Sequence, residues 1–138
     1  MDWKTFEDET MNLARMIDYA PDMVVGIARG GVIPAALLSK SLGVKDMFTL
    51  KLERENDRRI SADALPDISG KKILLVEDML ETGRGLMNGK KFLEDRGAVV
   101  KTACLYTMPI SETTPDFFLR QVGEVVDFPW NHLPSLAG

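Results

Sequence analysis

Residues 73–86 read Ile-Leu-Leu-Val-Glu-Asp-Met-Leu-Glu-Thr-Gly-Arg-Gly-Leu. The apolar run at the start is typical of a strand that is buried on both faces. Two acids end that strand, and a short turn with two glycines then opens a helix. Because parallel strands need helical crossovers, this strand-turn-helix unit predicts an α/β fold built on a parallel sheet.

The rest of the chain alternates in the same way, which predicts one twisted, mostly parallel sheet flanked by helices, with a small C-terminal hood. In such sheets ligands bind outside the carboxyl ends of the strands. The expected elements are a helix over residues 5–19 that Pro21 ends, a strand over 23–27, a helix over 34–42, strands over 47–52 and 72–76, a helix over 84–96 and a strand over 99–106.

The turn after the two acids suits a phosphate group. Thr82, Gly83 and Gly85 let the backbone turn sharply and point several N–H groups inward, where a helix start adds its positive dipole end. Glu77 and Asp78 can accept hydrogen bonds from a vicinal diol, or bind a hard divalent cation through oxygen. The turn therefore predicts a sugar phosphate as the ligand.

Two common phosphate motifs do not fit this turn. A P-loop needs Lys followed by Ser or Thr at the helix start, whereas residues 83–86 are Gly-Arg-Gly-Leu. A dinucleotide fingerprint needs Gly-x-Gly-x-x-Gly, but Gly83, Gly85 and Gly89 are spaced one residue too far. Both motifs are excluded on spacing.

A second anion-binding loop follows the first expected strand. Residues 28–31 read Ala-Arg-Gly-Gly, so that Arg29 places a fixed cation beside two glycines that expose backbone N–H groups. Pro34 suits the first turn of the helix that comes next. The chain thus offers two anion pockets on two strand ends, although Arg29 could instead pair with an acid on the surface.

Together these loops resemble the phosphoribosyltransferases, which move ribose 5-phosphate from phosphoribosyl pyrophosphate (PRPP) to a base. Residues 76–85 resemble the PRPP signature of that family, with Glu81 where Asp is usual and Gly85 where Thr is usual. Residues 28–31 resemble the pyrophosphate loop of the bacterial xanthine and guanine enzymes. Residues 125–130, Val-Val-Asp-Phe-Pro-Trp, are similar to the hood segment of small hypoxanthine, guanine and xanthine transferases.

The resemblance implies a Mg²⁺-dependent transfer in which pyrophosphate leaves and a base nitrogen attacks. It assigns catalysis to Arg29, at the leaving group, and to Glu81, which would move a proton unless it is a plain turn residue. It assigns the metal contact to Asp78. The residues expected to bind PRPP are Arg29, Gly30, Glu77, Asp78, Glu81, Thr82, Gly83, Arg84 and Gly85.

A purine is the first choice of base, but two departures leave the base open. The family usually has a Lys at the position of Met108 and an aromatic residue at the position of Val125. Val125, Val126 and Trp130 are the residues expected to bind the base, although Trp130 could equally pack against the sheet edge. Loss of a charged donor is worth roughly 1.5–3 kcal/mol of discrimination.

Residues 53–61, Glu-Arg-Glu-Asn-Asp-Arg-Arg-Ile-Ser, are highly charged and have no sustained periodicity. In the family a mobile loop at this place folds over the active site, so Arg58 or Arg59 could reach the pyrophosphate. The alternative is a solvated hairpin.

The composition limits the other classes of function. A chain of 138 residues with 45% hydrophobic residues predicts one domain over residues 1–138. The lack of a long apolar run or a signal peptide predicts a cytoplasmic protein with no membrane partner, and the formal charge of -4 disfavours nucleic acid. Cys104 lies in an apolar run and is expected in the core. Small family members often form homodimers, so we expect one here.

Two rival functions use the same residues. A non-catalytic PRPP-binding or regulatory module would keep the sugar-phosphate site and lose base chemistry, as Met108 and Val125 suggest. A phosphatase or kinase would use Glu77 and Asp78 as metal ligands.

Overall fold

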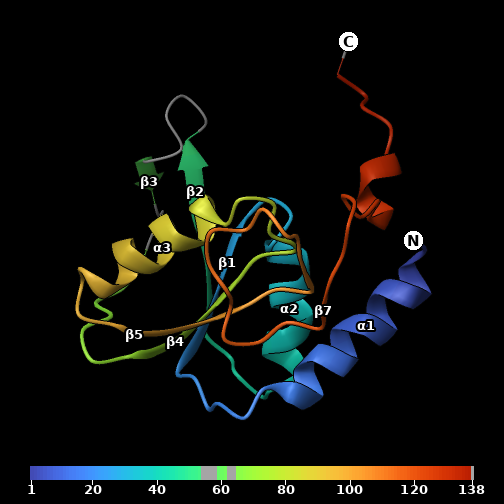
Figure 1. Cartoon of the computed structure of the whole chain (residues 1–138). Coiled ribbons are helices and arrows are strands. Elements are labelled where there is room, and N and C mark those ends of the chain that lie inside the picture. Colours follow the sequence, from blue (N-terminus) through green and yellow to red (C-terminus); the bar gives the residue numbers. More distant parts are fainter. Residues whose placement is uncertain (54–58, 62–64, 138) are drawn as a thin grey trace.

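The computed structural model describes residues 1–53, 59–61 and 65–137. A five-stranded sheet of order β3-β2-β1-β4-β5 runs through the molecule (Figure 1). The β1, β2, β4 and β5 strands are parallel, and β3 runs antiparallel to β2 at one edge. The predicted mostly parallel α/β sheet is therefore confirmed. The strands are β1 Met23–Ala28, β2 Met47–Glu53, β3 Arg59–Ser61, β4 Lys72–Val76 and β5 Val99–Ala103.

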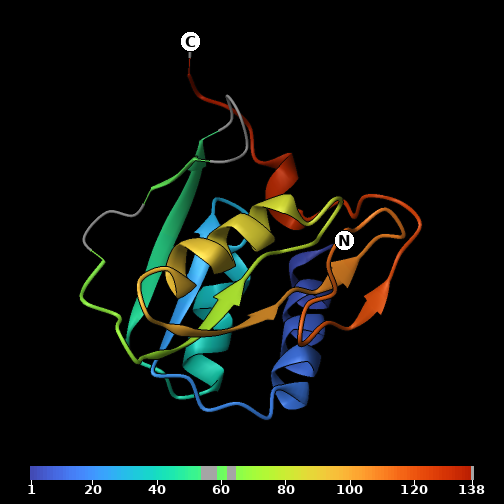
Figure 2. The ribbon, with the colours of Figure 1, turned by 60° about the vertical axis from the view of Figure 1, so that its left-hand side comes forward.

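Helices cover both faces of this sheet. Figures 1 and 2 show α3 on one face and α2 with α1 on the other. A short 3-10 helix, η1, follows near the C-terminus. Among the described residues, every helix is too short or too polar to cross a bilayer. The helices are α1 Trp3–Met16, α2 Val32–Ser41, α3 Arg84–Glu94 and η1 Pro129–His132.

The β4 strand explains why both layers are needed. Leu74 and Val76 pack into the cluster formed with α1 and α2, whereas Ile73 and Leu75 pack into the cluster under α3. All four side chains are fully buried, because alternate residues of a strand point to opposite faces. The apolar run therefore fixes β4 in the middle of the sheet and places the next residue, Glu77, at its carboxyl edge.

Two predicted boundaries were wrong for local reasons. The first helix begins at Trp3 because the Asp2 carboxylate accepts a hydrogen bond from the Thr5 amide at 2.7 Å, which caps the helix start. It ends at Met16 because Ile17 turns to an extended backbone and buries its side chain in the core. The prediction of residues 5–19 missed this cap.

The strand predicted over residues 99–106 is divided in two. The β5 strand stops at Ala103, and the chain continues beside the loop that follows β4: the Leu105 amide donates to the Asp78 carbonyl, and the Leu80 amide donates to the Tyr106 carbonyl. A two-stranded parallel sheet then forms from β6 Tyr106–Thr107 and β7 Arg120–Gln121. Cys104 is buried, as predicted.

Candidate functional site

The two loops singled out in the sequence meet at one edge of the sheet. The β1 and β4 strands are direct neighbours, with Gly26 paired to Val76, so the residues that follow them leave the sheet side by side. The first loop begins at Ala28, whose peptide bond to Arg29 is cis, and leads into α2. The second runs from Glu77 to the start of α3. Parallel topology thus brings together groups about 50 positions apart in the chain.

Contact between the loops depends on a missing side chain. A Cβ atom on Gly30 would lie 2.8 Å from Cγ of Asp78, closer than real Cβ atoms approach another carbon. Because glycine stands there, the Asp78 carboxylate can lie against the backbone of the first loop. The two anion-binding loops are therefore in direct contact, with one acid between them.

The paired acids are held by their own backbone. Glu77 Oε1 accepts from the Asp78 amide at 3.1 Å, and Asp78 Oδ1 accepts from the Met79 amide at 2.7 Å. Burial, together with the neighbouring Asp78 charge, raises the pKa of Glu77 well above its usual range. Burial also raises the pKa of Asp78, and the Glu81 charge adds to this effect. A bound cation, or a diol that donates hydrogen bonds, would therefore stabilise the charged forms of these two carboxylates.

A divalent cation fits these acids. Two adjacent carboxylates with raised pKa values supply hard oxygen ligands, and Mg²⁺ is usually bound by one or two carboxylates together with substrate phosphates and water. Across the described part of the chain, no three His, Cys, Asp or Glu side chains gather as a protein-only metal cage would require.

The turn at Thr82 and Gly83 forms the second half of the site. Gly83 has φ 82° and ψ 2°, a left-handed conformation that favours glycine, and it directly precedes α3. The Thr82 hydroxyl accepts from the Arg84 amide at 3.3 Å, which tightens the turn. Within the described residues, the Thr82 and Gly83 amides donate to no other group. They are therefore available to an anion.

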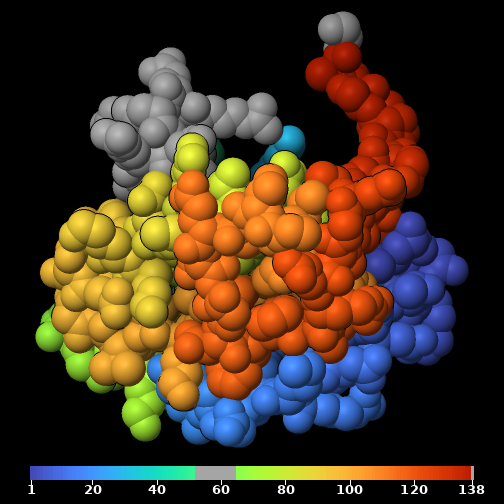
Figure 3. All heavy atoms as spheres, viewed as in Figure 1, coloured from blue at the N-terminus to red at the C-terminus, as the bar shows by residue number. Residues whose placement is uncertain are grey.

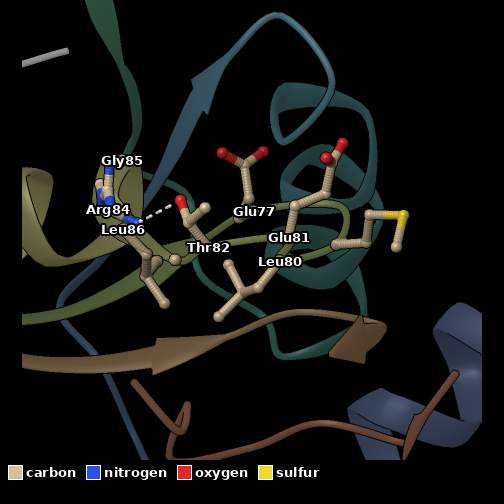
Figure 4. Close-up of a pocket in the computed structure, with 9 residues that line it drawn as sticks. Glu77, Leu80, Glu81, Thr82, Arg84, Gly85 and Leu86 are labelled. Atoms are coloured by element: carbon tan, nitrogen blue, oxygen red, sulfur yellow. Dashed lines mark hydrogen bonds between the residues drawn. The ribbon is translucent and has the colours of Figure 1, made fainter. Parts of the chain in front are cut away.

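These residues line a cavity of about 210 Å³. Figure 4 shows the Glu77 and Glu81 carboxylates pointing to one side of the loop and the Leu80 side chain pointing to the other. Glu81 is exposed, as a group that meets a ligand must be. The cavity is lined by Glu77, Met79, Leu80, Glu81, Thr82, Gly83, Arg84, Gly85 and Leu86.

A larger cleft of about 810 Å³ is lined by Asp78. In the space-filling view the C-terminal residues, drawn in red, rise above the body of the molecule beside this cleft (Figure 3). Arg29 and Gly30 line the cleft from the first loop, and Asp78 lines it from the second. The other lining residues are Ile33, Trp130, Asn131, Leu133, Pro134 and Ser135.

The structure separates the three residues expected to bind the base. Trp130 lines the large cleft and stacks on Phe128, with ring centroids 4.7 Å apart. Val126 packs against the core instead. Val125 is 58% exposed and lines neither the cavity at the phosphate turn nor the large cleft. Met108 lines a separate cavity of about 220 Å³ with Ser111 and Phe118.

The predicted lid falls largely beyond the described residues. Arg58 lies outside them, and for Arg59 the structure describes the backbone alone, in β3. The side chain of His132 is exposed, and its ring hydrogen-bonds Asp127 Oδ2 at 2.6 Å.

Sequence reasoning missed the segment that supports the phosphate turn from behind. The Ser111 hydroxyl donates to the Glu81 carbonyl at 2.7 Å, and the Glu112 amide donates to the Thr82 carbonyl at 2.7 Å. The Glu112 carboxylate also pairs with Arg84, through bonds of 2.9 and 3.2 Å, and this pairing lowers the pKa of Glu112. These contacts span about 30 positions, so no local spacing could have indicated them.

Comparison with known proteins agrees with this geometry. A family model described as "Phosphoribosyl transferase domain" matches residues 2–134. The chain is 26% identical to a xanthine-guanine phosphoribosyltransferase of Idiomarina loihiensis, over 99% of this chain and 91% of that protein. It is also 29% identical to an orotate phosphoribosyltransferase of Helicobacter pylori, over 99% of this chain and 67% of that protein.

Solved structures show the same architecture. A purine phosphoribosyltransferase from Pyrococcus horikoshii superposes with a TM-score of 0.86 at 28% identity, covering 100% of this chain and 96% of the other. The xanthine-guanine-hypoxanthine phosphoribosyltransferase of Helicobacter pylori superposes with a TM-score of 0.81 at 22% identity, covering 95% and 90%, and shows the shared fold.

Proposed function

Because the chain belongs to the phosphoribosyltransferase family, we propose that it transfers ribose 5-phosphate from PRPP to a nucleobase and releases pyrophosphate. A purine is the preferred base. The whole of residues 1–138 would form one phosphoribosyltransferase domain, of which the family model covers residues 2–134.

The observation that carries this proposal is the contact between Gly30 and Asp78. It joins two anion-binding loops on either side of a pair of carboxylates. PRPP has a phosphate at one end, a pyrophosphate at the other and a vicinal diol between them. The order of groups in the site therefore matches the order of groups in that substrate.

The reaction breaks the bond from the anomeric carbon to the pyrophosphate oxygen and forms a bond from that carbon to a base nitrogen. Arg29 and the Gly30 amide would stabilise the charge that develops on the leaving oxygen. In known sites the loss of one such donor costs about 2.7–4 kcal/mol. The Thr82 and Gly83 amides would hold the 5-phosphate and so fix the reacting carbon.

The carboxylates would have separate tasks. Glu77 and Asp78 would accept hydrogen bonds from the ribose hydroxyls, and Asp78, which also lines the cleft with Arg29, is the candidate metal ligand. A bound Mg²⁺ would neutralise charge on the pyrophosphate. Exposed Glu81 is the candidate group for taking the proton that the base nitrogen loses.

The preference for a purine rests on the names of the relatives and on the aromatic residue that lines the large cleft. The Idiomarina and Pyrococcus relatives are named for xanthine-guanine and purine transfer, whereas the Helicobacter relative is named for orotate. Trp130 presents an aromatic ring to the large cleft, and a ring of this kind can pack against a flat base. Met108 lacks the charged donor of purine enzymes.

A second candidate is a non-catalytic module that binds PRPP. It is favoured by Met108, which stands where the resemblance implies Lys, and by Val125, which stands where the resemblance implies an aromatic residue. The two candidates differ in turnover and agree in PRPP binding.

A transfer assay with labelled PRPP, Mg²⁺ and separate purine, pyrimidine and nicotinic bases tests the proposal. Formation of a nucleotide with one base, and none with the Asp78→Asn variant, supports it. PRPP binding without turnover of any base supports the non-catalytic module. Phosphate release from other phosphate esters, without PRPP, would support a phosphatase instead.

The proposal extends to location and assembly. The single Cys104 is a buried free thiol, which is compatible with a reducing cytoplasm, where structural disulfides are rare. A homodimer is the expected assembly because small family members often form one.

A further inference from the structure

The segment from Met108 to Thr113 lies behind the phosphate turn and touches it at three successive residues. The Ser111 hydroxyl donates to the Glu81 carbonyl at 2.7 Å, with the Leu80 carbonyl at 3.3 Å. The same hydroxyl accepts from the Met108 amide at 3.3 Å, which holds it in place. One residue further along both segments, the Glu112 amide donates to the Thr82 carbonyl at 2.7 Å.

These bonds fix the direction of two amides. In a trans peptide unit the carbonyl of one residue and the N–H of the next point in opposite directions. The Glu81 carbonyl points back to Ser111, so the Thr82 N–H points away from it. The Thr82 carbonyl points back to Glu112, so the Gly83 N–H also points away. Neither of these two amides donates a hydrogen bond to another group within the described residues.

Two further contacts limit movement of the turn. The Glu112 carboxylate grips the Arg84 guanidinium through two nitrogen atoms, at 2.9 and 3.2 Å. The Thr113 methyl group lies 2.8 Å from the place that a Cβ atom on Gly83 would take, so the turn cannot shift toward this segment. The turn is thus supported along its whole rear side.

We propose that Ser111, together with the backbone of Glu112, is a positioning element that aims the Thr82 and Gly83 amides at the 5-phosphate of the substrate. This inference rests on the proposed function, because it takes the anion in the turn to be that phosphate. Ser111 touches no reacting atom and is a positioning residue. Its loss should weaken binding of the phosphate end of PRPP and leave the pyrophosphate end unaffected.

The Ser111→Ala variant tests this directly. Without the hydroxyl, the Glu81 carbonyl loses the donor that sets the orientation of the Glu81–Thr82 peptide unit, so the Thr82 amide is no longer held in line with a dianion. We expect the affinity for ribose 5-phosphate to fall about tenfold or more, as for the loss of a hydrogen bond to a charged group. The affinity for pyrophosphate, which would bind at Arg29 and Gly30, should stay within about twofold. Ser111→Thr keeps the hydroxyl and should restore ribose 5-phosphate binding.

The matched control is Thr114→Ala, which removes an exposed hydroxyl one residue beyond this segment and leaves every contact to the turn in place. Titration of all variants with ribose 5-phosphate and, separately, pyrophosphate gives the result. A selective loss for ribose 5-phosphate in Ser111→Ala, absent in Thr114→Ala, supports the proposal. An unchanged affinity, or an equal loss for both ligands, overturns it.

Two other results are possible, a variant that does not fold and a protein that binds no ligand. If Ser111→Ala does not fold, Ser111→Cys gives the same comparison, because a thiol is a poor hydrogen-bond donor of similar size. If the unaltered protein binds neither ribose 5-phosphate nor PRPP, the proposed function fails first and this inference falls with it.

Discussion

Gly30 and Asp78 are packed so closely that a Cβ atom on Gly30 would lie 2.8 Å from the Asp78 carboxyl carbon. The two residues belong to different loops and are brought together by the parallel pairing of β1 with β4. Asp78 lines a cleft together with Arg29, whereas its neighbour Glu77 lines the cavity at the phosphate turn. The chemistry proposed for the site depends on this placement.

The Gly30→Ala variant should therefore displace the Asp78 carboxylate and leave the fold intact. Its backbone conformation is open to alanine, since Gly30 is not among the residues with positive φ. Displacement of a group by about 1 Å can reduce turnover by about 100-fold, so we expect kcat/KM for PRPP to fall by about that factor. Steady-state kinetics with the best base provide the measurement.

The Gly123→Ala variant is the matched control, because a Cβ atom there meets nothing within 4 Å. It should keep full activity and the same thermal midpoint. Full activity in Gly30→Ala would mean that the position of Asp78 against the first loop does not matter.

The Glu77→Gln variant should be more stable than the unaltered protein without ligand, and should bind PRPP less well. Burial and the Asp78 charge raise the pKa of Glu77, so folding holds the charged form in an unfavourable place. The native state then binds more protons than the unfolded state, and stability falls as pH rises above the ordinary carboxylate pKa of about 4.3. Glutamine carries no charge at any pH, so the variant lacks this destabilisation.

Urea unfolding over a pH series gives the test. The free energy of unfolding of Glu77→Gln should exceed that of the unaltered protein at neutral pH, and the difference should shrink toward low pH, where Glu77 is protonated in both states. A variant that is less stable at neutral pH would show that the Glu77 charge is compensated inside the protein.

Glu9 should be an anchor for the β6–β7 sheet. Its carboxylate accepts from the Tyr106 hydroxyl at 3.0 Å and pairs closely with Arg120, which also lies over the Tyr106 ring. Burial and the Glu9 carboxylate raise the pKa of Tyr106 to about 12. Because Glu9 is only 14% exposed, Glu9→Ala should lower the free energy of unfolding by about 1.5–3 kcal/mol, as measured with urea.

The pH dependence of this effect has a definite sign. The Arg120 hydrogen bond lowers the pKa of Glu9, so its contribution is present above the unfolded pKa of about 4.3 and is lost as pH falls through the lower folded pKa. The difference between Glu9→Ala and the unaltered protein should therefore narrow in acid. A pH-independent difference would assign the effect to packing alone.

Arg29→Ala should weaken binding of pyrophosphate and leave binding of ribose 5-phosphate unchanged, because Arg29 lines the large cleft and not the cavity at the phosphate turn. Loss of a charged hydrogen bond predicts a change of about tenfold or more in the dissociation constant. Lysine keeps the charge without the planar fork, so Arg29→Lys should recover part of the affinity. Equal weakening of both ligands would remove Arg29 from its assigned place.

The parts of the fold and site that could be predicted are those encoded locally. The apolar run before Glu77 and the glycines after Thr82 specify a buried strand and a turn by their own chemistry, and both lie where they were expected. The alternation of strands and helices also predicts that β1 and β4 run parallel. That these two strands are neighbours, like the rest of the strand order, could be learned only from the structure.

The parts that could not be predicted depend on contacts between distant residues. Ser111 supports Glu81 across 30 positions, and nothing beside either residue indicates the partner. The strand predicted over residues 99–106 is divided because its later residues pair with the loop after β4, which is a tertiary contact. Val125 was assigned to the base site by its position in a motif, and that assignment stays a prediction.

We infer that the residues from Glu77 to Gly85 bind a ribose through its hydroxyls and its phosphate at once. Calorimetric titration of PRPP in magnesium buffer is the decisive measurement. It is done at two temperatures, because the binding enthalpy can be zero at one of them. We expect saturable binding at one site per chain, strongly weakened in Asp78→Asn. No binding heat at either temperature would contradict the claim, and the proposed activity would fall with it.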